Sequence, residues 1–322
     1  MPQDANEQKY ATEHALLQVS DGCGIFSCNA LYAMTPQNIG KHYYYNSHIY
    51  FIGQNSKIRF LQADRITNDI FRIIYEVDGE KKCKKRIGTS DLSGCSDEIS
   101  SIETKDEGKS VQILKKDGTI YRESSFYTLL QFTENPPPEF LNVKTLYIGQ
   151  AFGDGEGKKK RTAIERLKAH STLQEIIIKE SERSWLNTQL LFFTFTLPYR
   201  LILKMDGRGQ PLVTGDEDSA HTKSIFENPL TEKQRISIIE ASLIRYFQPY
   251  YNTHYVHEYP TPENKHLTDA YRYDYNAIIT EIDTEDIRIN LFSDIIKPAS
   301  HHIAQFDLYS IEERKSFFNY KL

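Results

Sequence analysis

Alternating apolar and polar residues dominate the first third of the chain and predict β-strands there. Two pairs of runs turn at Asp-Gly, a dipeptide that favours tight hairpins because both residues tolerate positive φ. The paired runs are 70–77 with 81–87, and 111–115 with 119–122. The polar stretch 88–109 is predicted to be mostly loop, and a weak helical pattern covers 7–17. Residues 1–122 are therefore expected to form a β-rich N-terminal domain.

The pattern changes after residue 122, where apolar strands alternate with amphipathic helices. Strands are predicted over 126–132, 144–149, 189–197 and 201–204, and helices over 159–172 and 173–179. Between 205 and 226, Gly, Asp and Pro occur with little periodicity, which indicates a surface insertion. We expect an α/β fold of the α+β kind, with a second domain at 123–256 and a C-terminal extension at 257–322. Within that extension, 277–282 reads as a strand and 311–318 as a helix.

One predicted helix, capped by Thr231 and ended by Pro249, has an acid in its apolar stripe. Apolar residues recur at 236, 239, 243, 244 and 247, and Glu240 completes the same face. An ionised carboxylate among apolar side chains is costly unless a cation or hydrogen-bond donors meet it. Glu240 is therefore expected to have such a partner.

Glu240 also belongs to an ordered set of residues. Tyr147 lies in the strand Leu-Tyr-Ile-Gly-Gln, Arg166 and His170 share one helix face, and Asn252 follows Pro-Tyr-Tyr. In this order the residues resemble the catalytic module of the GIY-YIG nucleases over about 125–255. The resemblance implies a small core in which helices flank a three-stranded antiparallel sheet, and metal-dependent hydrolysis of phosphodiesters.

The resemblance also implies a role for each residue. Tyr147 would face the site, Arg166 would contact the phosphate through its planar fork, and His170 would hydrogen-bond the phosphate or a tyrosine hydroxyl. Glu240 would hold one divalent metal, Mg²⁺ with Mn²⁺ as an alternative. Asn252 would brace the site through hydrogen bonds.

The first motif of the family, Gly-Ile-Tyr, is expected ten to thirty residues before Tyr147. Ser125-Phe126-Tyr127 keeps the tyrosine without the glycine, so Tyr127 is the first choice and Tyr121 the second. Two similar segments are set aside. Gly-Ile-Phe at 24–26 is too distant, and Tyr-Phe-Ile-Gly-Gln at 50–54 has no Arg-x-x-x-His after it.

Charge is distributed unevenly along the chain. A basic run beside the motif, together with Gln150, could contact phosphates, although such a run alone is more typical of a solvated loop and helix start. The run comprises Lys158, Lys159, Lys160 and Arg161. Residues 257–322 hold 7 Lys and Arg against 12 Asp and Glu, which accounts for the whole net charge of −5. We expect this acidic extension to inhibit the site or to dock a partner. The alternative is that 277–282 adds a strand to a core sheet, so that its removal would expose an apolar edge.

Composition limits the classes of protein to which the chain can belong. A chain of 322 residues with 39% hydrophobic and 26% charged residues is long enough for two or three globular domains. It shows no signal peptide and no apolar run that could span a bilayer. The four cysteines lack CxxC spacing, so reduced thiols and a cytoplasmic location are expected.

These observations predict a Mg²⁺-dependent endonuclease acting on nucleic acid, most readily double-stranded DNA, in restriction or phage defence. Two alternatives keep the same fold. One is a nucleic-acid-binding module that has lost cleavage, and the other is an interaction protein regulated by a partner. The protein could also form a homodimer or bind a protein partner.

Overall fold

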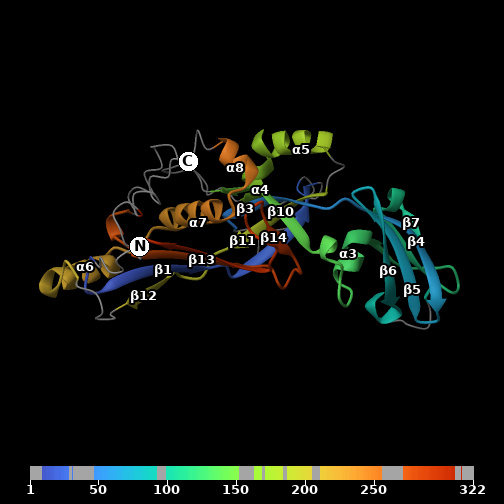
Figure 1. Ribbon diagram of the computed structural model, residues 1–322, viewed down its shortest axis with the longest axis horizontal. Coiled ribbons are helices and arrows are strands. Elements are labelled where there is room, and N and C mark those ends of the chain that lie inside the picture. Colours follow the sequence, from blue (N-terminus) through green and yellow to red (C-terminus); the bar gives the residue numbers. More distant parts are fainter. Residues whose placement is uncertain are drawn as a thin grey trace, which may run out of the picture.

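The computed structural model describes residues 9–28, 31, 47–92, 99–151, 163–168, 171–183, 187–204, 211–255, 271–308 and 313. Two sheets and their helices form the larger part of the molecule, and two smaller sheets form an arm at one end of its long axis (Figure 1). This mixture of sheets and helices confirms the α+β class. No helix in the described ranges is long and apolar enough to cross a membrane.

The central sheet has five strands in the order β14-β10-β3-β11-β2. These strands are β14 (Asn290–Phe292), β10 (Asn142–Gln150), β3 (Ile49–Asn55), β11 (Asn187–Thr194) and β2 (Gly22–Ser27). β3 runs antiparallel to both β10 and β11, whereas β14 runs parallel to β10. Three antiparallel strands are therefore present, but they lie inside a larger sheet.

A second sheet has four strands in the order β12-β1-β13-β15. Its strands are β12 (Arg200–Lys204), β1 (Glu13–Val19), β13 (Ala277–Asp283) and β15 (His301–Asp307). The parallel pair β1 and β13 joins segments far apart in sequence, with Leu17 opposite Ile279. The predicted helix at 7–17 is wrong, because Glu13–Val19 alternates between buried and half-buried positions as a strand does.

Helices cover both faces of the central sheet. On one face lie α4 (Ala163–Lys168) and α5 (Ser171–Arg183), packed through a core that includes Ile52, Leu190 and Leu167. On the other lies α7 (Glu232–Phe247), which also packs on the second sheet. α7 begins with a capping box between Thr231 and Gln234, which confirms the predicted start.

The arm is formed by residues between β3 and β10. Its sheets are β4 (Ile58–Thr67) with β5 (Ile70–Val77) and β6 (Glu80–Gly88), and β7 (Ile99–Lys105) with β8 (Ser110–Lys115) and β9 (Ile120–Ser125). Both Asp-Gly hairpins are confirmed, with positive φ at Asp78 and Gly79. β7 replaces part of the predicted loop. The arm has a core of its own, which includes Phe60, Phe71 and Phe126.

The predicted domain boundaries do not match the strand pairing. β1 and β3, expected in a separate N-terminal domain, pair with β12, β13, β10 and β11. β13, β14 and β15, expected in an appended extension, belong to the two main sheets. Strand pairing is a long-range interaction that a local pattern cannot reveal, so only the arm is a unit continuous in sequence.

Two more element predictions are corrected. The run 126–132, expected to be a strand, is the helix α3 (Phe126–Gln131), whose Phe126, Leu129 and Leu130 are buried at helical spacing. The expected insertion at 205–226 contains α6 (Gly215–Glu227). Short apolar runs do not distinguish a strand from a buried helix, which explains the first error. The predicted helix at 311–318 lies almost entirely outside the described residues.

Candidate active site

β3 and β10 bring two tyrosines together on one face of the central sheet. Tyr50 lies opposite Gly149 in the ladder, and its ring centroid is 6.2 Å from that of Tyr147. The two side chains also influence each other's ionisation. The tyrosine that joins Tyr147 is therefore in the segment 50–54, which sequence analysis set aside.

Gly149 leaves room for this pair. A Cβ atom at residue 149 would lie 2.6 Å from the Cζ and Oη atoms of Tyr50 and 2.8 Å from Cε1 of Tyr147. Such distances are far below van der Waals contact, so any larger residue would push the rings apart. The glycine of Tyr-Ile-Gly is thus explained by the two rings that pack over it.

Two helices add charged side chains to the pair. Arg166 of α4 lies close enough to Tyr50 for its positive charge to lower the pKa of that tyrosine. Glu240 of α7 is only 4% exposed, and its charge influences both tyrosines and Arg166. The buried acid predicted from the helix pattern is therefore confirmed, and a cation and two tyrosines lie in its electrostatic surroundings.

Burial controls the protonation of the two tyrosines. It raises the pKa of Tyr50 to about 12, with Glu240 raising it further and Arg166 opposing the shift. Burial, followed by Tyr50 and Glu240, raises the pKa of Tyr147 well above its usual value. Both side chains are neutral phenols at neutral pH, as any tyrosine is, and the upward shifts keep them neutral at alkaline pH as well.

Asn252 braces the strand that carries Tyr147. It lies on α8 (Tyr250–Tyr255), where its side-chain oxygen accepts from Ile148 N at 2.7 Å and its amide donates to Ile148 O at 2.9 Å. β14 pairs with β10 only at 142–144, so the edge of β10 is open at Ile148 and the amide completes its hydrogen bonding. The contacts agree with the bracing role that was predicted.

Tyr127 and Tyr121 do not join this cluster. Tyr127 lies on α3 and packs in the arm, with its ring centroid 5.8 Å from that of Phe140. Tyr121 is half-buried at the same core. A spacing of ten to thirty residues assumes a short hairpin, whereas here the whole arm interrupts the connection from β3 to β10. The sequence did contain a signal for Tyr50. Ile49-Tyr50 matches the last two residues of Gly-Ile-Tyr, and Gly53-Gln54 follows it as Gly149-Gln150 follows Tyr147.

Some predicted contacts cannot be placed. His170 and the basic run Lys158, Lys159, Lys160 and Arg161 lie outside the described residues. Gln150 is half-buried at the end of β10, opposite Ile49. It is thus close in the ladder to Tyr50, at the end of the sheet where the tyrosines meet.

The donor set around Glu240 restricts which metal it could hold. Among the described residues there is no group of three or more His, Cys, Asp or Glu that could bind an ion. Zinc sites need several such ligands, whereas Mg²⁺ is commonly bound by one or two carboxylates, with water and phosphate completing its shell. A single buried carboxylate therefore fits Mg²⁺ and does not fit a structural zinc site.

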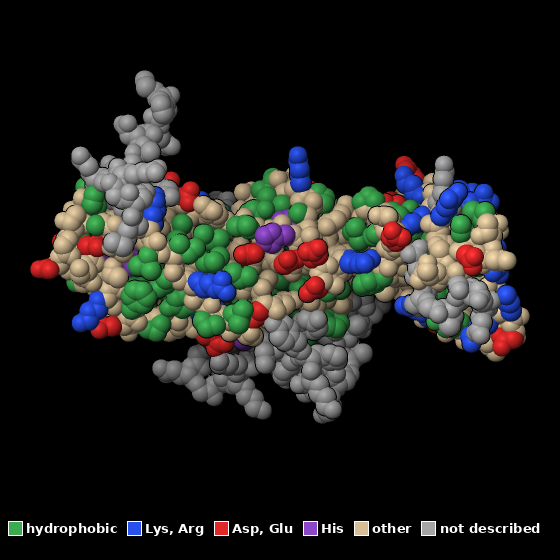
Figure 2. All heavy atoms as spheres, turned by 90° about the horizontal axis from the view of Figure 1, so that it is seen from below, with side chains coloured by type: hydrophobic (Ala, Val, Ile, Leu, Met, Phe, Trp, Pro, Cys, Tyr) green, Lys and Arg blue, Asp and Glu red, His purple; other side chains and the backbone are tan. Residues whose placement is uncertain are grey.

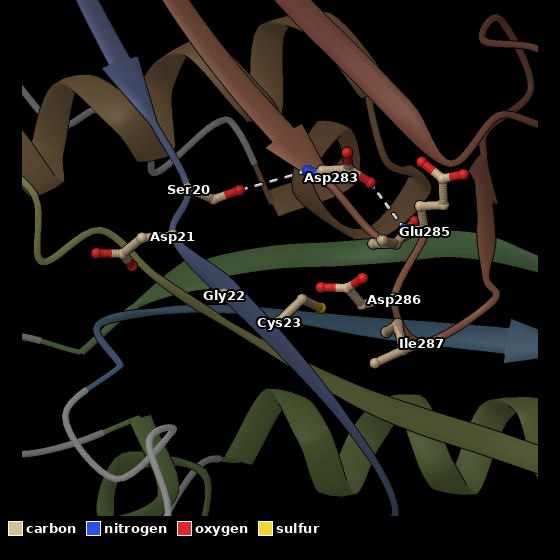
Figure 3. Close-up of a pocket in the computed structure, with 9 residues that line it drawn as sticks. Ser20, Asp21, Gly22, Cys23, Asp283, Glu285, Asp286 and Ile287 are labelled. Carbon is tan, nitrogen blue, oxygen red and sulfur yellow. Dashed lines mark hydrogen bonds between the residues drawn. The ribbon is translucent and has the colours of Figure 1, made fainter.

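A separate hollow of about 550 Å³ lies between the turn after β1 and the end of β13 (Figure 3). Its acids are Asp21, Asp283, Glu285 and Asp286. Asp21 accepts from the backbone of Thr196 at 2.8 Å, and Asp283 accepts from Glu285 N at 2.7 Å. Two of the acids thus stabilise turns, and the hollow contains no member of the tyrosine cluster.

Comparison of the chain with models of protein families, with curated proteins and with solved structures finds no match. An interpretation of the site therefore depends on its own geometry and on the residues that carry the resemblance to the GIY-YIG nucleases.

Proposed function

We propose that the protein is a Mg²⁺-dependent endonuclease of the GIY-YIG type, with Tyr50, Tyr147, Arg166 and Glu240 at its active site. The observation that supports this most is convergence. Four residues of three types suited to phosphodiester hydrolysis come from four separate elements, β3, β10, α4 and α7, and influence one another electrostatically. Tyr50 takes the place that the sequence assigned to Tyr127.

The chemistry assigns a task to each side chain. Arg166 presents a planar fork that suits two phosphate oxygens and stabilises charge as it develops. Tyr50 and Tyr147, as neutral phenols, orient the attacking water by hydrogen bonds. Glu240 would hold Mg²⁺, which when bound supplies Lewis-acid stabilisation of the phosphate. Asn252 keeps β10, and with it Tyr147, in position.

Double-stranded DNA is the proposed substrate, because the resemblance is to restriction, repair and homing enzymes. A use in restriction or phage defence rests on this analogy and not on the chemistry of the site. The cytoplasm is the compartment where such an enzyme would meet DNA with its four cysteines reduced.

The test is nicking of supercoiled plasmid by the purified protein with Mg²⁺, with Mn²⁺ and with EDTA. Glu240→Gln keeps the shape of the side chain and removes its charge, so we expect metal-dependent nicking to disappear. Glu217→Gln, an exposed acid in the first turn of α6, is the matched control and should cleave normally. Full nicking by Glu240→Gln would refute the assignment.

A second candidate is a nucleic-acid-binding module without cleavage. The specific observation in its favour is burial, because Tyr50 is 0% exposed and Glu240 4% exposed. On this hypothesis the cluster only ties β3, β10 and the helices together. Salt-sensitive DNA binding without nicking in either metal, combined with a lower melting temperature for Glu240→Gln, would favour it.

A further inference from the structure

The outward face of the second sheet carries apolar side chains that the described helices leave uncovered. Helices α6 and α7 pack on the opposite face, against Leu16 and Ile278 among others. Because neighbouring residues of a strand point to opposite faces, the next residues on each strand face outward. They include Ala15, Leu17, Val19, Ile202, Ile279 and Ile303. Figure 2 shows apolar side chains gathered on this side of the molecule.

The outward face is less polar than a solvated sheet face should be. Antiparallel strands with one wet face usually alternate apolar-in and polar-out. Here Leu17 and Ile279 are half-buried at the centre, and Ile202 and Ile303 on the edge strands are 44% and 48% exposed. A contiguous apolar patch with a polar rim is typical of an interaction surface.

Charged residues at the rim differ in sign between the two edges. Arg200 and Lys204 lie on the β12 edge, in the rows on either side of Ile202. Asp307 lies on the opposite edge strand, β15. It belongs to the same cross-strand row as Ile202, a row that runs through Ala15 and Ala277. Glu281, next in from Ile303, is paired with His301 at 2.8 Å. The β12 edge therefore carries two basic residues and the β15 edge one acid, Asp307, which accepts a hydrogen bond from Gln305 at 3.1 Å, around an apolar centre.

We propose that this face binds a second copy of the same chain, across a two-fold axis parallel to the strands. Such an axis places β12 of one copy over β15 of the other, so that Asp307 meets the pair Arg200 and Lys204. At the centre, Leu17 of each copy meets Ile279 of the other. The small residues Ala15 and Ala277 let the two sheets approach closely. The charge pattern and the apolar pattern are both self-complementary, as an isologous contact requires.

The size of the face sets the strength of this association. Four strands spaced by about 4.8 Å, each contributing about five residues of 3.4 Å, span roughly 19 by 17 Å. This corresponds to roughly 320 Å² per copy, or about 650 Å² in total, which is below the roughly 1,200–2,000 Å² that stable specific interfaces bury and is the size of a weak contact. The dimer should accordingly be reversible and form as concentration rises. It is independent of the nuclease assignment, since no active-site residue takes part.

Sedimentation velocity of the full chain over a wide concentration range tests the proposal. We expect a monomer–dimer equilibrium in the native protein and at least a tenfold weaker dimer in Ile202→Glu. Ile66→Glu, at a 52% exposed isoleucine of the arm, is the matched control and should dimerise normally. A native protein that stays monomeric at every concentration would overturn the proposal, as would equal dimerisation by both variants.

A charge exchange tests the geometry. Arg200→Glu and Asp307→Arg should each weaken the dimer, and the double variant should restore it, because the two positions meet only between copies. Within one chain they lie on opposite edges of the sheet. Failure of the double variant to recover would exclude this two-fold arrangement. A monomer whose outward face is protected from hydrogen exchange would instead show that the chain covers it itself.

Discussion

At the scale of single residues, the site depends on which tyrosine accompanies Tyr147. Tyr50 lies in the electrostatic surroundings of Arg166 and beside the ring of Tyr147, whereas Tyr127 packs against Phe140 in the arm. The two are well matched for comparison, because burial raises the pKa of each to about 12. Phenylalanine at either position keeps the ring and removes one hydroxyl.

Tyr50→Phe should lower the nicking rate on the order of 10²-fold, the usual effect of deleting one preorganised hydrogen-bonding group at a reaction centre. Tyr127→Phe should cut at the normal rate and change the free energy of unfolding by about 1 kcal/mol. Rates come from plasmid time courses and stabilities from urea unfolding. The reverse order of effects would return the first-motif role to Tyr127.

Gly149→Ala should displace both rings, because the added Cβ would lie 2.6 Å from Tyr50. We expect a loss of activity and a destabilisation of about 1–3 kcal/mol, as for other overpacked sites. A double-mutant cycle with Tyr50→Phe, scored by nicking rate, gives the sharper result. Once the added methyl group has displaced the rings, removal of the Tyr50 hydroxyl should lower the nicking rate less than it does in the native protein. Additive effects of the two changes would show that Gly149 does not position the tyrosines.

At the scale of elements, the side chain of Asn252 links α8 to β10 by two hydrogen bonds. Replacing Asn252 with Leu leaves the N–H and C=O groups of Ile148 without their partner, and each buried orphan costs about 1–3 kcal/mol. We expect a lower urea midpoint with an unchanged m-value. Asn228→Leu, just after α6, removes only an exposed bond to Ser224 O at 2.9 Å and serves as the control. Equal stability of the two variants would show that Asn252 contributes little.

The packing of α6 on β1 should make stability depend on pH. Burial lowers the pKa of His14 on β1 and of His221 on α6, whose rings meet edge-on with centroids 5.6 Å apart. Because the folded pKa lies below the unfolded value near 6.5, stability is complete above that pH and is lost as pH falls through the folded pKa. Thermal unfolding between pH 7.5 and 5.5 measures the loss, which should shrink in His14→Phe. His302 also has a lowered pKa and keeps part of the dependence in that variant. An unchanged dependence would contradict the assignment to His14.

At the scale of the whole molecule, the acidic extension is part of the fold. β13 lies between β1 and β15, and β14 adds to β10. Ile278, Ile282 and Leu291 are fully buried in the cores beneath α7. The expectation of an appended extension is therefore corrected, because its strands complete both main sheets.

Deletion of 258–322 should give an insoluble or unfolded protein, since β1 and β10 would each lose a neighbour and expose apolar edges. Solubility on expression and far-UV circular dichroism provide the measurement. A chain ending after residue 308, which keeps all three strands, is the control for removal of C-terminal residues without removal of the strands. A soluble, cooperatively folded deletion would restore the idea of an appended tail.

Local signals in the sequence were sufficient for several elements. Both Asp-Gly hairpins and the helix between Thr231 and Pro249 were predicted correctly, because turn chemistry and capping act within a few residues. The buried acid at Glu240 was also visible, since a 3.6-residue period places it among apolar neighbours. The secondary structure of short apolar runs such as 126–132 could not be predicted from neighbouring residues, because the same residues fit a strand or a buried helix.

The sequence by itself determined the turns, the main helix, the α+β class and most members of the tyrosine–arginine–glutamate set. Only the tertiary structure decided that Tyr50 is the partner of Tyr147, that the arm interrupts their hairpin, and that the C-terminal strands complete both sheets. The physical reason is the range of the interactions. Caps and tight turns are satisfied by neighbours in the chain, whereas strand pairing joins residues at any separation and is selected by the core that the whole chain buries.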